Sequence, residues 1–123
     1  MDFKGKCAVV TGGSGGIGRA TSLAFSKAGA KLVIVDVNGD AAGAVAEEIK
    51  SHGGEAISIA ADVTKSADVQ RYVKAAVDAY GTIDLFFNNA GIEGNLTPLV
   101  DYDEDLFDQV MAVNVRGVFL GLK

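Results

Sequence analysis

The chain has 123 residues, enough for one domain with a substantial buried core. Its 11 basic and 16 acidic residues give a net charge of −5, without the basic footprint that nucleic acids and anionic membranes require. No apolar run approaches the roughly 18 residues of a membrane span, and the N-terminus lacks a signal-peptide pattern. We therefore expect a cytoplasmic domain with no nucleic-acid or membrane partner. The single cysteine, Cys7, is expected to be a buried apolar residue.

Short apolar runs alternate with helix-period segments along the whole chain, which is typical of β-α-β units in a parallel sheet. The predicted strands are Cys7–Thr11, Lys31–Asp36, Ala56–Ala60 and Ile83–Asn88. The predicted helices are Gly16–Ala28, Gly39–His52, Ser66–Tyr80 and a last one that begins near Asp103. Right-handed crossovers place these strands in the order 3-2-1-4. The expected fold is α/β, a Rossmann-like doubly wound parallel sheet, with residues 1–123 as a single domain.

The turn between the first strand and the first helix is dense in glycine. Gly13, Gly15 and Gly18 match the dinucleotide fingerprint G-x-G-x-x-G, in which backbone approaches a pyrophosphate at a helix N-terminus. Asp36 lies 20 positions after Gly16, at the end of the second strand, where a carboxylate can accept the hydroxyls of an adenosine ribose. The turn and the acid together predict a dinucleotide site.

Further polar groups follow the third and fourth strands. Asp62 comes after the third, and the segment Asn88-Asn89-Ala90-Gly91 ends the fourth. Each has a purely structural interpretation, because Asp36 and Asp62 suit turn caps and the asparagines suit Asx turns. Their shared position at the carboxyl ends of parallel strands favours a ligand site at that edge. No metal-ligand spacing and no P-loop motif is present.

These motifs make the chain resemble the N-terminal part of a short-chain dehydrogenase/reductase of the NAD type, over essentially its whole length. The turn of that family, T-G-x-x-x-G-x-G, is matched between Thr11 and Gly18, its acid by Asp36, and its adenine-bracketing pair by Asp62-Val63. The resemblance implies an oxidoreductase that acts on a small alcohol or carbonyl compound with NAD(H). The cofactor-binding positions that it implies are Thr11, Gly12, Ser14, Gly16, Ile17, Gly18, Asp36, Asp62, Val63, Asn88, Ala90 and Gly91.

The resemblance places one catalytic position inside the chain, Asn114, with a structural and proton-relay role. The family's serine and its Tyr-x-x-x-Lys pair are not among these 123 residues, because no lysine stands four positions after Tyr72, Tyr80 or Tyr102. A free tyrosine has a pKa of about 10 and needs a nearby cation to move protons near neutral pH. We therefore expect the 123-residue chain, interpreted as truncated after its last helix, to be inactive by itself.

Three functions remain open. The first is the cofactor-binding part of an NAD-dependent oxidoreductase, and the second is a dinucleotide-binding module without chemistry or half of a complemented assembly. The third is another Rossmann-fold enzyme, such as an S-adenosylmethionine-dependent methyltransferase, which the Asn88–Gly91 segment disfavours. Asp36 predicts a preference for NAD(H) over NADP(H), because it repels a 2′-phosphate and Val37 offers no positive charge.

The sequence also predicts self-association. The doubly wound order calls for a fifth strand beside the fourth, and these residues do not supply one, so Leu85, Phe86 and Phe87 lie on an open edge. The last helix carries apolar residues on more than one stripe, including Val118 and Phe119. We expect a homo-oligomer, first of all a dimer.

Overall fold

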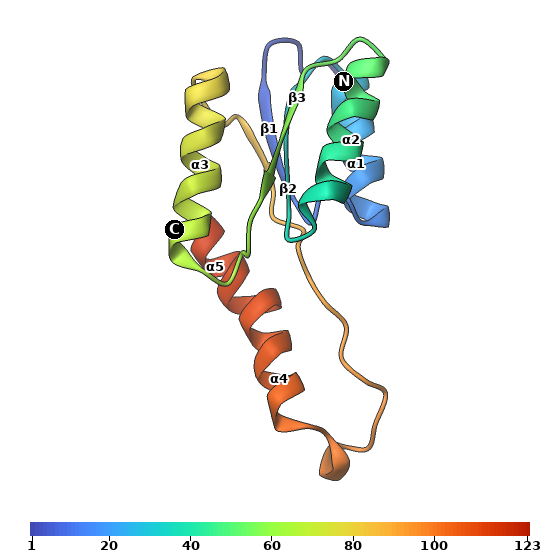
Figure 1. Cartoon of the computed structure of the whole chain (residues 1–123), viewed down its shortest axis with the longest axis vertical. Helices are drawn as coiled ribbons and strands as arrows, with labels where there is room; N and C mark the ends of the chain where they lie inside the picture. Colours follow the sequence, from blue (N-terminus) through green and yellow to red (C-terminus); the bar gives the residue numbers. More distant parts are fainter.

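The computed structural model describes all 123 residues and contains one four-stranded parallel sheet (Figure 1). The strands are β1 (Cys7–Thr11), β2 (Lys31–Asp36), β3 (Ala56–Ala60) and β4 (Leu85–Phe87). Their order is β3-β2-β1-β4, and all three neighbouring pairs run parallel. The predicted order and the bounds of the first three strands are confirmed.

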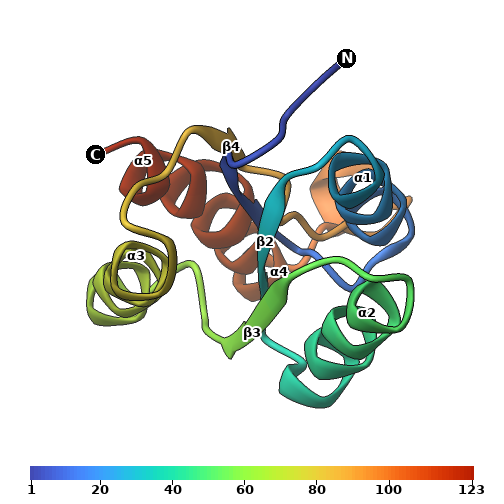
Figure 2. The ribbon, with the colours of Figure 1, turned by 90° about the horizontal axis from the view of Figure 1, so that it is seen from above.

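The helices form two layers around the sheet. They are α1 (Gly16–Lys27), α2 (Gly39–Ser51), α3 (Ser66–Tyr80), α4 (Glu104–Met111) and α5 (Gly117–Leu122), with a 3₁₀ turn η1 (Leu99–Asp101) and a π-helical turn η2 (Ala112–Arg116). Viewed from above, α1 and α2 cover one face of the sheet, and α3 and α5 cover the other (Figure 2). None of these helices combines the length and the hydropathy needed to cross a bilayer.

The two central strands are buried on both faces, which explains why their sequences are continuous apolar runs. On β1, Ala8 and Val10 pack toward α1 and α2, whereas Cys7 and Val9 pack toward α3. Burying one such valine contributes about 1.5–3 kcal/mol to folding. Burial also raises the pKa of the free Cys7 thiol, as expected for a cysteine with a structural role.

The bounds of three predicted elements differ from those in the structure. The fourth strand is Leu85–Phe87 and not Ile83–Asn88, because Asp84 forms a separate pair of hydrogen bonds with the Cys7 backbone and the Asn88 side chain donates to Val118 O. Helices α1 and α2 each end one residue earlier than expected. The last helix begins after Asp103 as predicted, but η2 interrupts it.

The segment between β4 and η2 extends away from the sheet. Figure 1 shows residues after β4 running along an extended path to η1, from which α4 and η2 return to α5. All residues from 91 to 101 are exposed. This arm forms one wall of the site described next.

Candidate functional site

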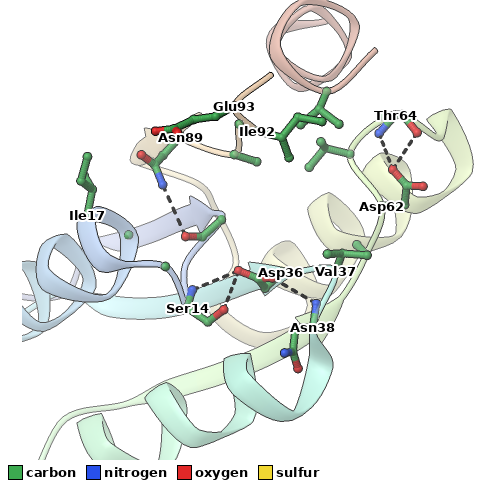
Figure 3. Close-up of a pocket in the computed structure, with 18 of the residues that line it drawn as sticks. Ser14, Ile17, Asp36, Val37, Asn38, Asp62, Thr64, Asn89, Ile92 and Glu93 are labelled. Carbon is green, nitrogen blue, oxygen red and sulfur yellow. Dashed lines mark hydrogen bonds between the residues drawn. The ribbon is translucent and has the colours of Figure 1, made fainter. Parts of the chain in front are cut away.

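A cavity of about 980 Å³ opens at the carboxyl edge of the sheet, where the strand order reverses between β1 and β4 (Figure 3). It lies at the upper end of the usual range for small-molecule sites, about 300–1,000 Å³. Five chain segments line it, at residues 12–18, 36–38, 61–64, 89–93 and 109–113. Open α/β sheets bind ligands at this topological position.

The turn between β1 and α1 is shaped so that only glycine fits its key positions. Gly12 has φ +62°, and a Cβ there would lie 2.9 Å from Ala90 Cα, while a Cβ at Gly18 would collide with Gly12 O. A Cβ at Gly16, in contrast, would meet nothing within 4 Å, so the turn faces open space. No side chain caps the first N–H groups of α1. The cradle therefore fits a pyrophosphate, which such free N–H groups and the helix dipole favour.

Asp36 lies at the end of β2 with its carboxylate held in place. Its Oδ2 accepts hydrogen bonds from the N–H and the hydroxyl of Ser14, at 3.2 and 2.7 Å, and its Oδ1 accepts from the Asn38 N–H at 3.0 Å. The next residue, Val37, is 77% exposed. No lysine, arginine or histidine lines the cavity. The carboxylate of Asp36 therefore has no basic neighbour in the cavity lining that could pair with a phosphate placed beside it.

Asp62 marks the far end of the cavity, after β3. Its Oδ1 accepts hydrogen bonds from the hydroxyl and the N–H of Thr64, at 2.6 and 2.9 Å, and these two bonds lower the pKa of the carboxyl group below its ordinary value. Val63 is buried against Gly117, where a Cβ would lie 2.7 Å from Val63 Cγ2. This close approach brings the residues after β3 against the start of α5.

Two of the predicted binding residues, Thr11 and Asn88, do not line the cavity but stabilise the segments around it. Thr11 is fully buried, and its Oγ1 accepts the N–H groups of Asn89 and Ala90 at 3.0 and 3.1 Å. Asn88 Nδ2 donates to Val118 O at 2.9 Å. These bonds join the ends of β1 and β4 to each other and to α5.

Asn114 lies within η2 and holds the loop after β4. Its Oδ1 accepts the Ile92 N–H at 2.8 Å, and its Nδ2 donates to Ile92 O at 2.9 Å. Asn114 does not line the cavity, but Ile92 does. Farther along the arm, the Tyr102 hydroxyl accepts the Asn95 N–H at 3.3 Å and so braces the same loop.

The structure brings most of the predicted residues together around one cavity. The predicted residues that line it are Gly12, Ser14, Gly16, Ile17, Gly18, Asp36, Asp62, Val63, Ala90 and Gly91. Sequence reasoning missed Asn38, Ala61, Thr64, Ile92, Glu93 and the α4–η2 residues Gln109, Ala112 and Val113. The last three stand at i, i+3 and i+4, which are neighbouring positions on one face of a helix.

Comparison with known proteins gives the same assignment. The model of the short chain dehydrogenase family matches residues 6–123. Levodione reductase of Leifsonia aquatica is 41% identical over 98% of this chain and 46% of its own length, and (+)-borneol dehydrogenase 2 of Salvia officinalis is 43% identical over 97% and 42%. The crystal structure of NAD⁺-bound xylitol dehydrogenase superposes with a TM-score of 0.96 at 38% identity, over 99% of this chain and 47% of that one.

The chain thus spans about half the length of the curated relatives that it matches. Within that half, the strand order, the glycine turn and the acid after β2 agree with the family assignment. The chain belongs to the short-chain dehydrogenase family.

Proposed function

We propose that the chain is the NAD(H)-binding part of an oxidoreductase that acts on an alcohol or carbonyl substrate. The observation that carries this proposal is the cavity that joins the glycine cradle before α1 to the carboxylate of Asp36. The names of the relatives, a reductase and two dehydrogenases, agree with this reaction class, and the xylitol dehydrogenase was solved with NAD⁺.

Each lining segment has a role in this proposal. The free N–H groups of the first turn of α1 bind the pyrophosphate, and Asp36 accepts ribose hydroxyls. Asp62 and Val63 border the adenine, while Ala90 and Gly91 border the opposite wall. Asn114 orients the backbone of Ile92 and thereby the loop toward the reacting end of the cofactor. The bound nicotinamide supplies the hydride donor or acceptor.

We further propose that NAD(H) binds more tightly than NADP(H). A 2′-phosphate beside Asp36 places two negative groups together, and no basic side chain lines the cavity to offset this repulsion. Like charges forced together at a binding site cost several kcal/mol, so at least a tenfold difference in dissociation constant is expected.

Isothermal titration of the 123-residue chain with NAD⁺ and NADP⁺ tests this preference. NAD⁺ should bind at least tenfold more tightly, and Asp36→Ala should narrow the gap because it removes both the ribose acceptor and the repulsion. Asp40→Ala is the matched control, since Asp40 is an exposed carboxylate in the first turn of α2 outside the cavity. Equal or tighter binding of NADP⁺ by the unmodified chain would contradict the proposal.

The same samples test whether the chain turns over substrate. These 123 residues contain no Tyr-x-x-x-Lys pair to move the proton on the substrate oxygen. With NAD⁺ and a panel of small alcohols, the chain should give no NADH absorbance above a blank. Turnover that survives purification and is lost in Tyr102→Phe or Asn114→Ala would assign the chemistry to residues of this chain.

Because these residues contain no Tyr-x-x-x-Lys pair, a second candidate function is also considered. A dinucleotide-binding module without its own chemistry, or one half of a complemented assembly, needs the same cradle and the same acid. Binding without turnover agrees with both candidates. Restored turnover on adding a polypeptide that carries a serine and a Tyr-x-x-x-Lys pair separates the complemented assembly from a purely binding module.

We also propose that the chain forms a homo-oligomer through its C-terminal helices. Side chains spaced about four residues apart along α4, η2 and α5 are 42–75% exposed although they are apolar, namely Phe107, Met111, Val115, Phe119 and Leu122. In addition, β4 pairs with β1 alone and leaves its other edge open. Exposed apolar surface of this kind is typical of a protein interface.

A further inference from the structure

The π-helical turn η2 contacts two separate segments of the cavity lining, the residues after β3 and the residues after β4. Toward the second of these, the Asn114 side chain makes its two hydrogen bonds with Ile92. Toward the first, Arg116 Nε donates to the carbonyl oxygen of Thr64 at 3.2 Å. Residues two positions apart in a helix project toward roughly opposite sides. One turn of helix therefore holds two walls of the cavity, on which Ile92 and Thr64 lie (Figure 3).

Arg116 is exposed and does not line the cavity, but the residue that it contacts is central to one wall. Thr64 is the residue whose hydroxyl and N–H hold the carboxylate of Asp62. Thr64 therefore accepts from η2 with its carbonyl oxygen and donates to Asp62 with its two donors. A chain of hydrogen bonds runs from Arg116 through Thr64 to Asp62, although Arg116 and Thr64 are 52 positions apart.

Packing beside this bond limits how far the wall can move. Gly117 follows Arg116 and is buried, and a Cβ there would lie 2.7 Å from Val63 Cγ2. Because Gly117 already contacts Val63, the loop at residues 61–64 cannot come closer to the C-terminal helices. The bond from Arg116 is the one hydrogen bond that keeps this loop from moving away from them. The two contacts together set the distance between η2 and the loop.

We propose that Arg116 is a positioning residue of the cavity: it holds the carbonyl of Thr64 against η2 and thereby fixes the wall after β3 before a dinucleotide binds. This inference rests on the proposed function, in which Asp62 and Val63 border the adenine. A wall that is fixed in advance loses less conformational freedom on binding than one that the ligand must order. Arg116 acts through Thr64 and contacts neither the ligand nor the reacting atoms.

Titration of ADP and NAD⁺ into Arg116→Met tests the inference. Methionine keeps an unbranched side chain without a donor, and the loss of one hydrogen bond predicts about fivefold weaker binding. Both ligands carry adenosine, so both affinities should fall by the same factor. Arg116→Lys keeps a donor and should recover most of the affinity. Lys74→Met is the matched control, because it removes an exposed cation on α3 that pairs with Asp78 outside the cavity, and both affinities should stay unchanged.

The outcomes separate this inference from the function on which it rests. If the unmodified chain binds neither ADP nor NAD⁺, the proposed function fails, and the inference fails with it. If the chain binds both ligands and Arg116→Met binds them equally well, only the inference is overturned. A loss confined to NAD⁺ also overturns it, because Arg116 would then act at the other end of the cofactor. Attraction between the Arg116 charge and the phosphates is screened by salt, so a loss that vanishes at about 0.5 M NaCl would likewise overturn it.

A second measurement uses the unmodified chain and does not depend on how a variant folds. The exchange of the Arg116 Nε–H with water is measured by ¹⁵N NMR and compared with that of the Arg71 Nε–H, because Arg71 donates to Ala60 O through Nη2 instead. The bond to Thr64 predicts slower exchange at Arg116, and saturation with ADP should slow it several-fold further. Exchange at the same rate as in Arg71, or no change with ADP, would contradict the proposal.

Discussion

At the residue scale, each of the two aspartates of the site is oriented by a neighbouring hydroxyl. Ser14 holds Asp36 across two segments, and Thr64 holds Asp62 from two positions along the same loop. A carboxylate that is fixed before the ligand arrives loses less side-chain freedom on binding. We therefore expect the hydroxyls of Ser14 and Thr64 to matter for ligand binding as much as the two carboxylates that they orient.

The Thr64 bond gives a prediction about pH. Thr64→Val keeps the shape and the backbone N–H but removes the largest cause of the lowered pKa, so the pKa of Asp62 should rise toward its ordinary value of 3.8. Because the native pKa is lowered, this carboxylate stabilises the fold above pH 3.8, and that contribution is lost as the pH falls through the native pKa.

Carboxyl carbon shifts followed by NMR between pH 2 and 6 measure the effect directly. Thr82→Val serves as the control because Thr82 is exposed and lies outside the cavity. An unchanged Asp62 titration in Thr64→Val would show that the backbone bond alone sets the pKa.

The carboxylates could be found from sequence, but their hydroxyl partners could not. Asp36 and Asp62 follow recognisable apolar runs, so their place at the sheet edge follows from the strand order. The bond from Ser14 to Asp36 depends on the relative twist of β1 and β2 and on the exact path of the glycine turn. No sequence pattern encodes that path.

At the element scale, the sequence predicts the parts that are stabilised locally. Strands β1 to β3 and helices α1 to α3 follow from apolar periodicity, within one residue at each end. The ends of β4 depend instead on contacts with Cys7 and Val118, and η2 coincides with the two hydrogen bonds between Asn114 and Ile92. Such long-range contacts lie outside local patterns, and this is why the ends of β4 and the π-helical turn η2 were not predicted.

The exposed stripe on α4, η2 and α5 gives the prediction at this scale. Acidic residues gather near the start of α4, where Asp103 and Glu104 lie, and basic residues lie toward the end, at Arg116 and Lys123. An antiparallel pair of these helices would join the apolar stripes and place opposite charges face to face. We therefore expect a dimer or larger assembly at tens of micromolar.

Size-exclusion chromatography with light scattering measures the assembly. Phe119→Glu should shift the chain toward monomer, because Phe119 is 58% exposed and central to α5. Val77→Glu is the matched control on α3, where Val77 is 45% exposed. A well-folded monomer of the unmodified chain at this concentration would contradict the proposed interface.

At the scale of the whole molecule, residues that are up to more than 90 positions apart in the sequence meet at one edge of the sheet. The cavity uses residues from Gly12 to Val113, and only the parallel order of the strands brings them together. Packing of α1 and α2 on one face and of α3 and α5 on the other holds that edge in register. The shape of the cavity therefore depends on the fold of the whole chain.

The most direct test is to locate bound NADH on the ¹⁵N-labelled chain by amide chemical shifts. We predict saturable shifts in the glycine turn, at Asp36 and in the segments 61–64 and 89–93, with the opposite edge of the sheet around Gly53 unaffected. The proposed NAD(H) site would be contradicted if a folded chain, judged by its dispersed spectrum, gave no saturable shifts with millimolar NADH or gave them away from the cavity.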